Sequence, residues 1–247
     1  MNKILLFIFL IVSFVDASNK KVIEFKSLDN LLITADLYMI DDDINRPFII
    51  LYHQAKSSRG EYNEIAIRLN TLGYNCMSVD LRAGDSSNNI KNETYLRAHK
   101  SNKKTSQLKA RIDIISALHY ARQYSNNLIA WGSSYSASLI LKTIGEKPRY
   151  AKAILAFSPG EYFSTVGKPD DYIRNSAKKI KIPVFITSAK NEVKNWQEIY
   201  NVINQEHRIA FIPKSKGNHG SSALWSKYPS SSEYWVAVEK FLKSLKQ

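Results

Sequence analysis

Ser134 lies at the centre of the segment Gly132-Ser133-Ser134-Tyr135-Ser136, between apolar segments at 127–131 and 137–141. The first apolar segment has the composition of a buried strand, and the second has that of a helix. The pattern is G-x-S-x-G with its last glycine replaced by Ser136, and such a pattern presents its central serine on a sharp strand-to-helix turn. Ser134 is therefore the predicted nucleophile.

His219 is the predicted general base for this serine. A serine hydroxyl attacks a carbonyl poorly near neutral pH unless a neutral imidazole or another base removes its proton. His219 lies in the glycine-flanked segment 217–220, shortly after an apolar segment at 208–212. A loop in that place can bring the imidazole over the end of a sheet. Ser134 and His219 together predict acyl transfer through a covalent intermediate.

The elements that would position these residues alternate between strands and helices. The predicted strands are short and apolar, as buried parallel strands are, and cover 48–52, 75–81, 128–131, 153–157, 183–187 and 208–212. Segments 21–25 and 31–38 flank a turn and predict an antiparallel hairpin before them. The sequence therefore predicts an α/β fold, with a mostly parallel open sheet and helices on both faces. We expect residues 18–247 to form a single domain.

Two connections between these elements are long. Residues 83–106 are polar and charged, and they predict a surface excursion from a strand end, where α/β folds place their sites. Residues 158–182 are too short for a large helical lid, although Tyr162, Phe163 and Tyr172 could line one side of a cleft. We therefore expect an open site.

Residues 1–17 have the composition of a secretory signal peptide. Lys3 precedes an apolar stretch at 4–15, and a small-residue cleavage pattern ends at Ala17. The apolar stretch is shorter than the roughly 20 residues that a spanning helix needs. We expect an exported protein, in the periplasm or outside the cell. Cys76 is the one cysteine, so no intrachain disulfide is expected.

The net charge of +13 bears on possible partners. Basic residues are spread over most of the chain, and the denser stretches at 99–111 and 174–181 lack the interleaved aromatic residues that bind single-stranded nucleic acid. We expect a solvated basic surface and no nucleic-acid partner. Weak association with anionic envelope surfaces is an open alternative.

The chain resembles the α/β-hydrolase family, and among its members the small lidless dienelactone hydrolases and esterases. The resemblance extends over residues 18–247 and rests on segments that follow the predicted strands in the family's order: Tyr52-His53-Gln54-Ala55, residues 78–86, the turn at Ser134, and Gly217-Asn218-His219-Gly220. It implies a serine hydrolase that cleaves a small-molecule carboxylic ester through an acyl-enzyme.

The resemblance also implies which groups stabilise the oxyanion. One donor would be the backbone N–H of Tyr135, at the start of the helix after the nucleophile. The second would be the N–H of Ala55, in the loop after the strand at 48–52. Gln54 replaces a glycine that is common in that loop. Gln54 and His53 are the predicted substrate-binding side chains, with an architectural role as the alternative for His53.

The acid that would orient His219 is less directly indicated. The family pattern places an aspartate where this chain has Asn191, and an amide cannot supply the negative charge that stabilises an imidazolium. Glu192 is the next residue and reaches further, so it is the predicted acid. Glu161, after the strand at 153–157, is the alternative. Either carboxylate could instead be a solvated loop charge.

The sequence predicts neither a metal site nor a cofactor. His, Cys and carboxylate residues show no metal-ligand spacing, and neither a phosphate loop nor a dinucleotide glycine fingerprint follows a strand. Two alternatives to the esterase stay open. One is a non-catalytic binding protein with a hydrolase fold, which Asn191 and Ser136 favour, and the other is an amidase or peptidase of that fold.

Overall fold

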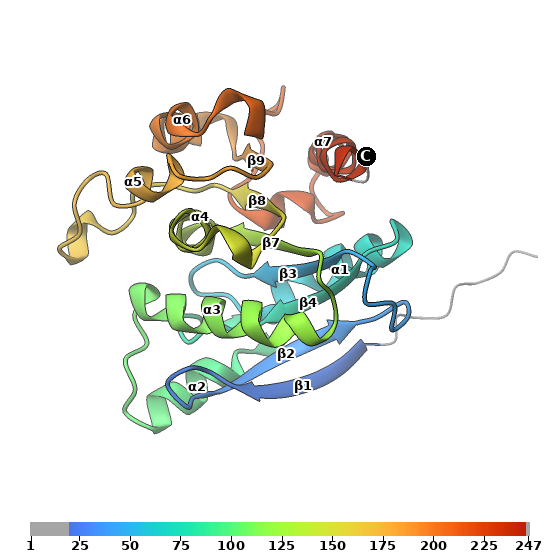
Figure 1. Cartoon of the computed structure of the whole chain (residues 1–247), viewed down its shortest axis with the longest axis vertical. Helices are drawn as coiled ribbons and strands as arrows, with labels where there is room; N and C mark the ends of the chain where they lie inside the picture. The colour runs from blue at the N-terminus through green and yellow to red at the C-terminus, as the bar shows by residue number, and fades with distance from the viewer. Residues whose placement is uncertain (1–19, 246–247) are drawn as a thin grey trace, which may run out of the picture.

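The computed structural model describes residues 20–245, so the predicted signal segment 1–17 lies outside the described residues. Its main strands are β1 (Lys20–Lys26), β2 (Leu32–Tyr38), β3 (Phe48–Tyr52), β4 (Asn75–Val79), β7 (Leu128–Ser133), β8 (Ala153–Phe157), β9 (Val184–Thr187) and β10 (Arg208–Phe211). They form an eight-stranded sheet in the order β1-β2-β4-β3-β7-β8-β9-β10 (Figure 1).

The sheet is antiparallel at β1 and β2 and parallel elsewhere. β1 pairs with β2, and β2 with β4, in antiparallel register. The pairs β3–β4, β3–β7, β7–β8, β8–β9 and β9–β10 are parallel. The predicted mostly parallel sheet and its N-terminal hairpin are thus confirmed. Because parallel strands point the same way, the loops after β3, β7, β8, β9 and β10 leave from one edge of the sheet, the edge formed by the carboxyl ends of these strands.

Helices cover both faces of this sheet (Figure 1). They are α1 (Asn63–Thr71), α2 (Glu93–Lys100), α3 (Ala110–Tyr120), α4 (Tyr135–Glu146), α5 (Arg174–Ala177), α6 (Val193–Val202) and α7 (Ser231–Ser244). Apolar side chains of α3, α4 and α6 share one buried cluster with the sheet. Those of α1 and α7 belong to a second cluster. The sheet is therefore the middle layer of three, as the sequence predicts.

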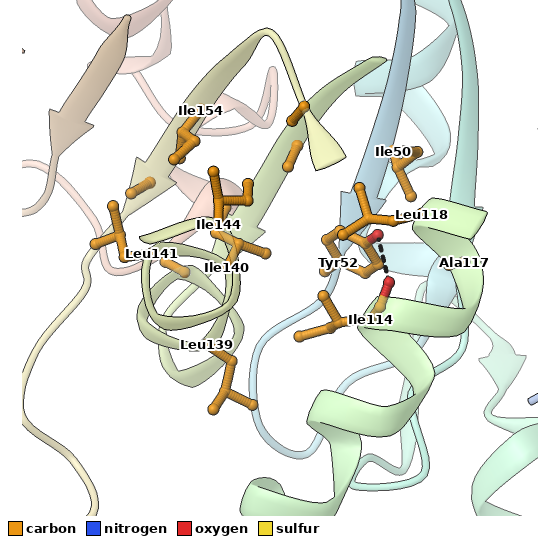
Figure 2. Packing of buried hydrophobic residues seen from close by; sticks show 14 of the residues in the cluster. Ile50, Tyr52, Ile114, Ala117, Leu118, Leu139, Ile140, Leu141, Ile144 and Ile154 are labelled. Carbon is orange, nitrogen blue, oxygen red and sulfur yellow. Dashed lines mark hydrogen bonds between the residues drawn. The ribbon is translucent and has the colours of Figure 1, made fainter. Parts of the chain in front are cut away.

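The first cluster fixes β3 and β7, the strands that precede the candidate site (Figure 2). Ile50 of β3, Ile114 of α3 and Ile140 of α4 are fully buried members of this cluster. The Tyr52 hydroxyl donates to the carbonyl oxygen of Ile114 at 3.2 Å, so the polar atom of this buried ring is also paired. Burial of these side chains holds the ends of both strands in one place.

The long connection 83–106 is more ordered than its composition predicts. It contains the short strands β5 (Ser86–Ser87) and β6 (Ile90–Lys91) and the helix α2. Thr94 and Ala98, one turn apart, are buried, and Thr94 Oγ1 accepts a hydrogen bond from the N–H of Thr34 at 3.0 Å. The side chains that α2 buries are small or carry a hydroxyl group, so the sequence shows no apolar periodicity that would predict this helix.

Candidate active site

Ser134 lies on a strained turn between β7 and α4. Its φ is 59° and its ψ is −123°, a conformation that costs a non-glycine residue about 1–3 kcal/mol. The N–H of Ser134 donates to the carbonyl oxygen of Phe157 in β8 at 2.7 Å, which helps to hold the turn. At Gly132 a Cβ atom would lie 2.6 Å from Cα of Ala137, so the helix passes too close to the strand for any side chain there.

Ser136 replaces the last glycine of the pattern and braces the same turn. Its Oγ accepts a hydrogen bond from the N–H of Ser133 at 2.9 Å. Its own proton can go to the carbonyl oxygen of Tyr52 at 2.8 Å or to that of Ser133 at 2.9 Å. The replacement is therefore compatible with the turn, because the hydroxyl satisfies buried backbone groups that a glycine would leave to other partners.

His219 and Glu192 form a hydrogen-bonded pair beyond the ends of β9 and β10. Glu192 Oε1 lies 2.7 Å from His219 Nδ1. The His219 side chain is 42% exposed, and that of Glu192 is 19% exposed. Glu192 ends the turn η6 (Lys190–Glu192) and directly precedes α6. With Nδ1 bound to the carboxylate, the Nε2 atom is the one that can exchange a proton with a substrate.

Ser158, the first residue after β8, supports this pair. Its hydroxyl donates to Glu192 Oε2 at 2.7 Å, and the N–H of Gly220 donates to Ser158 Oγ at 2.9 Å. Partial burial alone would raise the pKa of Glu192, but the hydrogen bonds from His219 and Ser158 outweigh it, and the pKa lies below its usual value. Glu192 is therefore ionised at neutral pH and can stabilise a protonated His219.

The loop of His219 packs directly against the turn of Ser134. The N–H of Ser221 donates to the Oγ of Ser133, the residue before Ser134, at 2.8 Å. At Gly220, where φ is 66°, a Cβ atom would lie 2.5 Å from Ser133 Oγ and 2.8 Å from Gln54 Oε1. Glycine at 220 thus lets three loops meet at one edge of the sheet.

The predicted oxyanion donors lie at this edge. Tyr135 N–H belongs to the first residue of α4, where amides have no partner within the helix. Ala55 is half-buried in the loop after β3. The N–H of Gln54 is already used, because it donates to Glu61 Oε2 at 2.8 Å, whereas the Gln54 side chain lies against Gly220. The Gln54 side chain is therefore the part of the loop after β3 that contacts the loop of His219.

His53 has a structural environment that does not fit the predicted role in substrate binding. It is fully buried, its Nε2 accepts the N–H of Leu81 at 2.9 Å, and its Nδ1 donates to the carbonyl oxygen of Gln54 at 2.7 Å. Asn92 Nδ2 also lies 3.1 Å from Nε2. Burial lowers the pKa of His53 to about 4. His53 is thus an architectural residue that links three segments of the chain.

The other residues considered for the acid are placed elsewhere. Glu161 accepts the N–H groups of Ile173 and Arg174 at 2.9 and 2.8 Å and so caps the start of α5. Its carboxylate oxygens are both engaged there rather than at His219. Asn191 is exposed. The longer side chain of Glu192, one residue further along, brings a carboxylate to the imidazole where Asn191 does not.

Tyr162 is a site residue that the sequence indicated only as part of a cleft wall. Its hydroxyl donates to the carbonyl oxygen of Ser158 at 2.7 Å and lies close enough to the Ser134 side chain for that hydroxyl to oppose the rise that burial causes in the Tyr162 pKa. At Gly160 a Cβ atom would lie 2.9 Å from the Tyr162 ring, so the ring folds back over this glycine. Sequence spacing gives no signal for that reversal of direction.

Three further observations concern metal sites, membrane-spanning helices and cavities in residues 20–245. No cluster of three or more His, Cys, Asp or Glu residues there could hold a metal ion. No helix in this range is long and apolar enough to cross a membrane. A cavity of about 500 Å³ lies at the opposite edge of the sheet, lined by residues that precede strands, among them Pro47, Asn127 and Pro183.

Solved structures with the same fold include esterases and a dienelactone hydrolase. The esterase Pf2001 from Pyrococcus furiosus is 19% identical, with a TM-score of 0.68 over 92% of this chain and 93% of that chain. Dienelactone hydrolase from Anabaena variabilis is 11% identical, with a TM-score of 0.68 over 92% of this chain and 98% of its own. Est1E from Butyrivibrio proteoclasticus, solved with ferulic acid bound, is 12% identical, with a TM-score of 0.68 over 90% and 98%.

These likenesses show that the chain has the α/β-hydrolase fold, as its sequence predicts. No family model matches the sequence, and no curated protein matches it either.

Proposed function

We propose that this protein is a serine hydrolase that cleaves a small-molecule carboxylic ester. The observation that supports the proposal best is the 2.7 Å contact between Glu192 and His219, at the same sheet edge as the strained turn of Ser134. The fold, which solved esterases share, is consistent with it. The contact also weakens the case for a non-catalytic protein, because Glu192 supplies the carboxylate that Asn191 lacks.

In the proposed acylation step, Ser134 Oγ attacks the ester carbonyl carbon while its proton passes to His219 Nε2. The Ser134 hydroxyl turns away from Tyr162 to do so. The carbonyl π-bond electrons move onto oxygen, and the N–H groups of Tyr135 and Ala55 stabilise the resulting oxyanion. Glu192 stabilises the imidazolium through Nδ1.

The intermediate then collapses and the acyl group is transferred. The carbonyl re-forms, the bond from carbon to the leaving oxygen breaks, and His219 Nε2 returns its proton to the departing alcohol. A water molecule deprotonated by the same nitrogen attacks the acyl-enzyme through an equivalent intermediate. Release of the carboxylic acid regenerates the Ser134 hydroxyl, so no cofactor is consumed.

The test compares Ser134→Ala with the wild-type protein on p-nitrophenyl acetate and on a fluorophosphonate probe. Loss of both turnover and labelling is expected, since both need an activated serine hydroxyl. Ser101→Ala, which changes an exposed serine at the end of α2, is the control and should behave as wild type. Undiminished turnover in Ser134→Ala would disprove the proposal.

We further propose that the hydrolase is exported, since residues 1–17 have the features of a cleavable signal peptide. The full-length chain expressed in a bacterium should be recovered outside the cytoplasm with its new N-terminus at Ser18. N-terminal sequencing of the secreted or periplasmic fraction tests this. An uncleaved chain that stays in the cytoplasm would contradict it.

A further inference from the structure

Glu61 is a buried carboxylate beneath the loop that carries Ala55. It belongs to the turn η1 (Arg59–Tyr62), which follows that loop, and it is fully buried. Its Oε2 accepts the N–H of Gln54, the residue next to the predicted oxyanion donor, at 2.8 Å. A carboxylate is costly to bury, so its place within the protein needs specific partners.

Hydroxyl groups lie around this carboxylate. No partner with hydrogen-bond geometry faces Glu61 Oε1 among residues 20–245, yet the hydroxyls of Ser133 and Ser57 are close enough to lower its pKa. Ser133 precedes Ser134 and also accepts the N–H of Ser221. Glu61 therefore contacts the loop after β3 and the turn of the nucleophile together.

The nearest strong cations along the chain do not neutralise Glu61. Arg59 points to other carboxylates: its Nε lies 2.9 Å from Asp36 Oδ1 and its Nη1 lies 2.7 Å from Asp80 Oδ2. Lys56 is exposed on the outer side of the loop. Glu61 is thus a carboxylate without a salt bridge in the part of the chain that the structure describes.

The titratable groups whose charges couple to Glu61 are Tyr62, Tyr135 and His219, and His53 precedes Gln54, whose N–H Glu61 accepts. Burial raises the pKa of Tyr62 and of Tyr135 well above the usual value, so both stay neutral. Burial lowers the pKa of His53 to about 4, so it too is neutral near pH 7. The charge of His219 is the one that acts on Glu61, and it lowers the pKa of that carboxyl.

We infer that Glu61 is a positioning residue of the hydrolase: its buried carboxylate accepts the Gln54 N–H and so holds the loop that carries Ala55. The inference rests on the proposed function. Glu61 touches no reacting atom and acts through Gln54. When protonated, it accepts the Gln54 N–H more weakly.

The direction of the pH dependence follows from the burial of Glu61. Burial raises its pKa to about 7, despite the hydrogen bonds that oppose this shift. Below that pH the carboxyl is protonated and activity falls, and above it the carboxylate supports catalysis. The loss of the carboxylate should therefore lower kcat/KM about tenfold as the pH falls through this range, beyond the losses that the rest of the site causes.

The test compares Glu61→Gln with the wild-type protein on p-nitrophenyl acetate between about pH 5 and 9, with active sites counted by fluorophosphonate titration. At about pH 9 the variant should have a kcat per active site about tenfold lower than the wild-type protein, with KM little changed, and this ratio should fall towards one at about pH 5, where Glu61 is protonated. Glu64→Gln, an exposed glutamate on α1, is the matched control and should keep the wild-type pH profile. A merely structural role would lower the number of active sites but leave the shape of the pH profile unchanged.

Two results overturn the inference: a ratio of wild-type to Glu61→Gln activity that stays the same between about pH 5 and 9, or undiminished kcat in the variant at about pH 9. If Glu61→Gln does not fold, Ser133→Ala tests the same point, because it keeps the carboxylate and removes a hydroxyl that stabilises its ionised form. Its acid limb should move to higher pH by about half a unit or more, and an unmoved limb overturns the inference.

Failure of the inference differs from failure of the proposed function. If Ser134→Ala keeps its turnover, the proposed function fails whatever Glu61 does. If Ser134→Ala is inactive while the ratio of wild-type to Glu61→Gln activity does not change with pH, only the role of Glu61 is disproved.

Discussion

His53 and His219 follow parallel strands of one sheet, yet their surroundings differ in almost every respect. His53 is fully buried, and both of its ring nitrogens are hydrogen-bonded within the protein. The His219 side chain is 42% exposed, its Nδ1 contacts a carboxylate, and no hydrogen bond engages its Nε2 among residues 20–245.

The difference shows that the partners of a histidine, more than its place after a strand, decide what it can do. A carbonyl oxygen and an amide N–H hold the His53 ring in one neutral tautomer. A carboxylate on His219 Nδ1 orients the ring and leaves the other nitrogen available to substrate. The first arrangement stabilises the fold, and the second is suited to proton transfer.

Replacing each histidine by glutamine gives the largest expected contrast. His219→Gln should lower kcat/KM by about 10⁴-fold, since it removes the proposed general base, with the free energy of unfolding nearly unchanged. His53→Gln should lower the free energy of unfolding by about 1–3 kcal/mol, because buried partners lose a hydrogen bond. Turnover per folded molecule should be retained. Urea denaturation and ester hydrolysis check both, and a stable but inactive His53→Gln would undo the comparison.

The carboxylate partner can be tested in the same way. Glu192→Gln should lower kcat by about 10²–10⁴-fold, because a neutral amide cannot stabilise the imidazolium. Glu161→Gln should cost about 0.5–2 kcal/mol of stability through the weakened cap of α5 and leave kcat unchanged. Steady-state kinetics and thermal unfolding of both variants separate the two carboxylates.

Asn191→Asp is the control for this pair. The exposed side chain at 191 is not the one that reaches His219, so the added charge should leave kcat within about twofold. If Asn191→Asp rescued Glu192→Gln, the acid would be interchangeable between the two positions.

The folded environment of His53 predicts a specific pH dependence of stability. Its pKa is lowered from about 6.5 to about 4, so the unfolded chain takes up the proton first as pH falls. The contribution of His53 is therefore full above about pH 6.5 and is lost progressively towards pH 4, by about 3 kcal/mol. Urea denaturation at several pH values should show a weaker dependence in His53→Gln than in the wild-type protein. Parallel curves would argue against a buried neutral His53.

Ser158→Ala should have a smaller effect on the proposed catalytic pair than Glu192→Gln. It removes one hydrogen bond to the ionised Glu192, and such bonds contribute about 1.5–3 kcal/mol. A loss of about ten- to a hundredfold in kcat is expected, with KM unchanged. Ser164→Ala, at an exposed position in the same connection, is the control. An unchanged kcat in Ser158→Ala would show that Glu192 is held by other contacts.

The sequence predicted the sheet well because its parallel strands are short apolar segments, and such segments are typical of strands that are buried on both faces. It also predicted that Ser134 and His219 follow strands whose ends meet at one edge. It did not predict the buried state of His53, because the partner Asn92 lies in a polar segment with no apolar periodicity. Nor did it predict Glu61 or Tyr162 near the nucleophile, since each reaches the site through a turn whose direction depends on tertiary contacts.

The backbone at Ser134 also determines how the protein would respond to selection for heat resistance alone. Its φ of 59° is unfavourable for serine and readily adopted by glycine. A screen that rewards only thermal tolerance should therefore enrich glycine at 134, the position where the gain in stability removes the reactive hydroxyl. Thermal stability and the proposed reaction favour different residues at position 134, so a screen for more stable variants needs an activity readout.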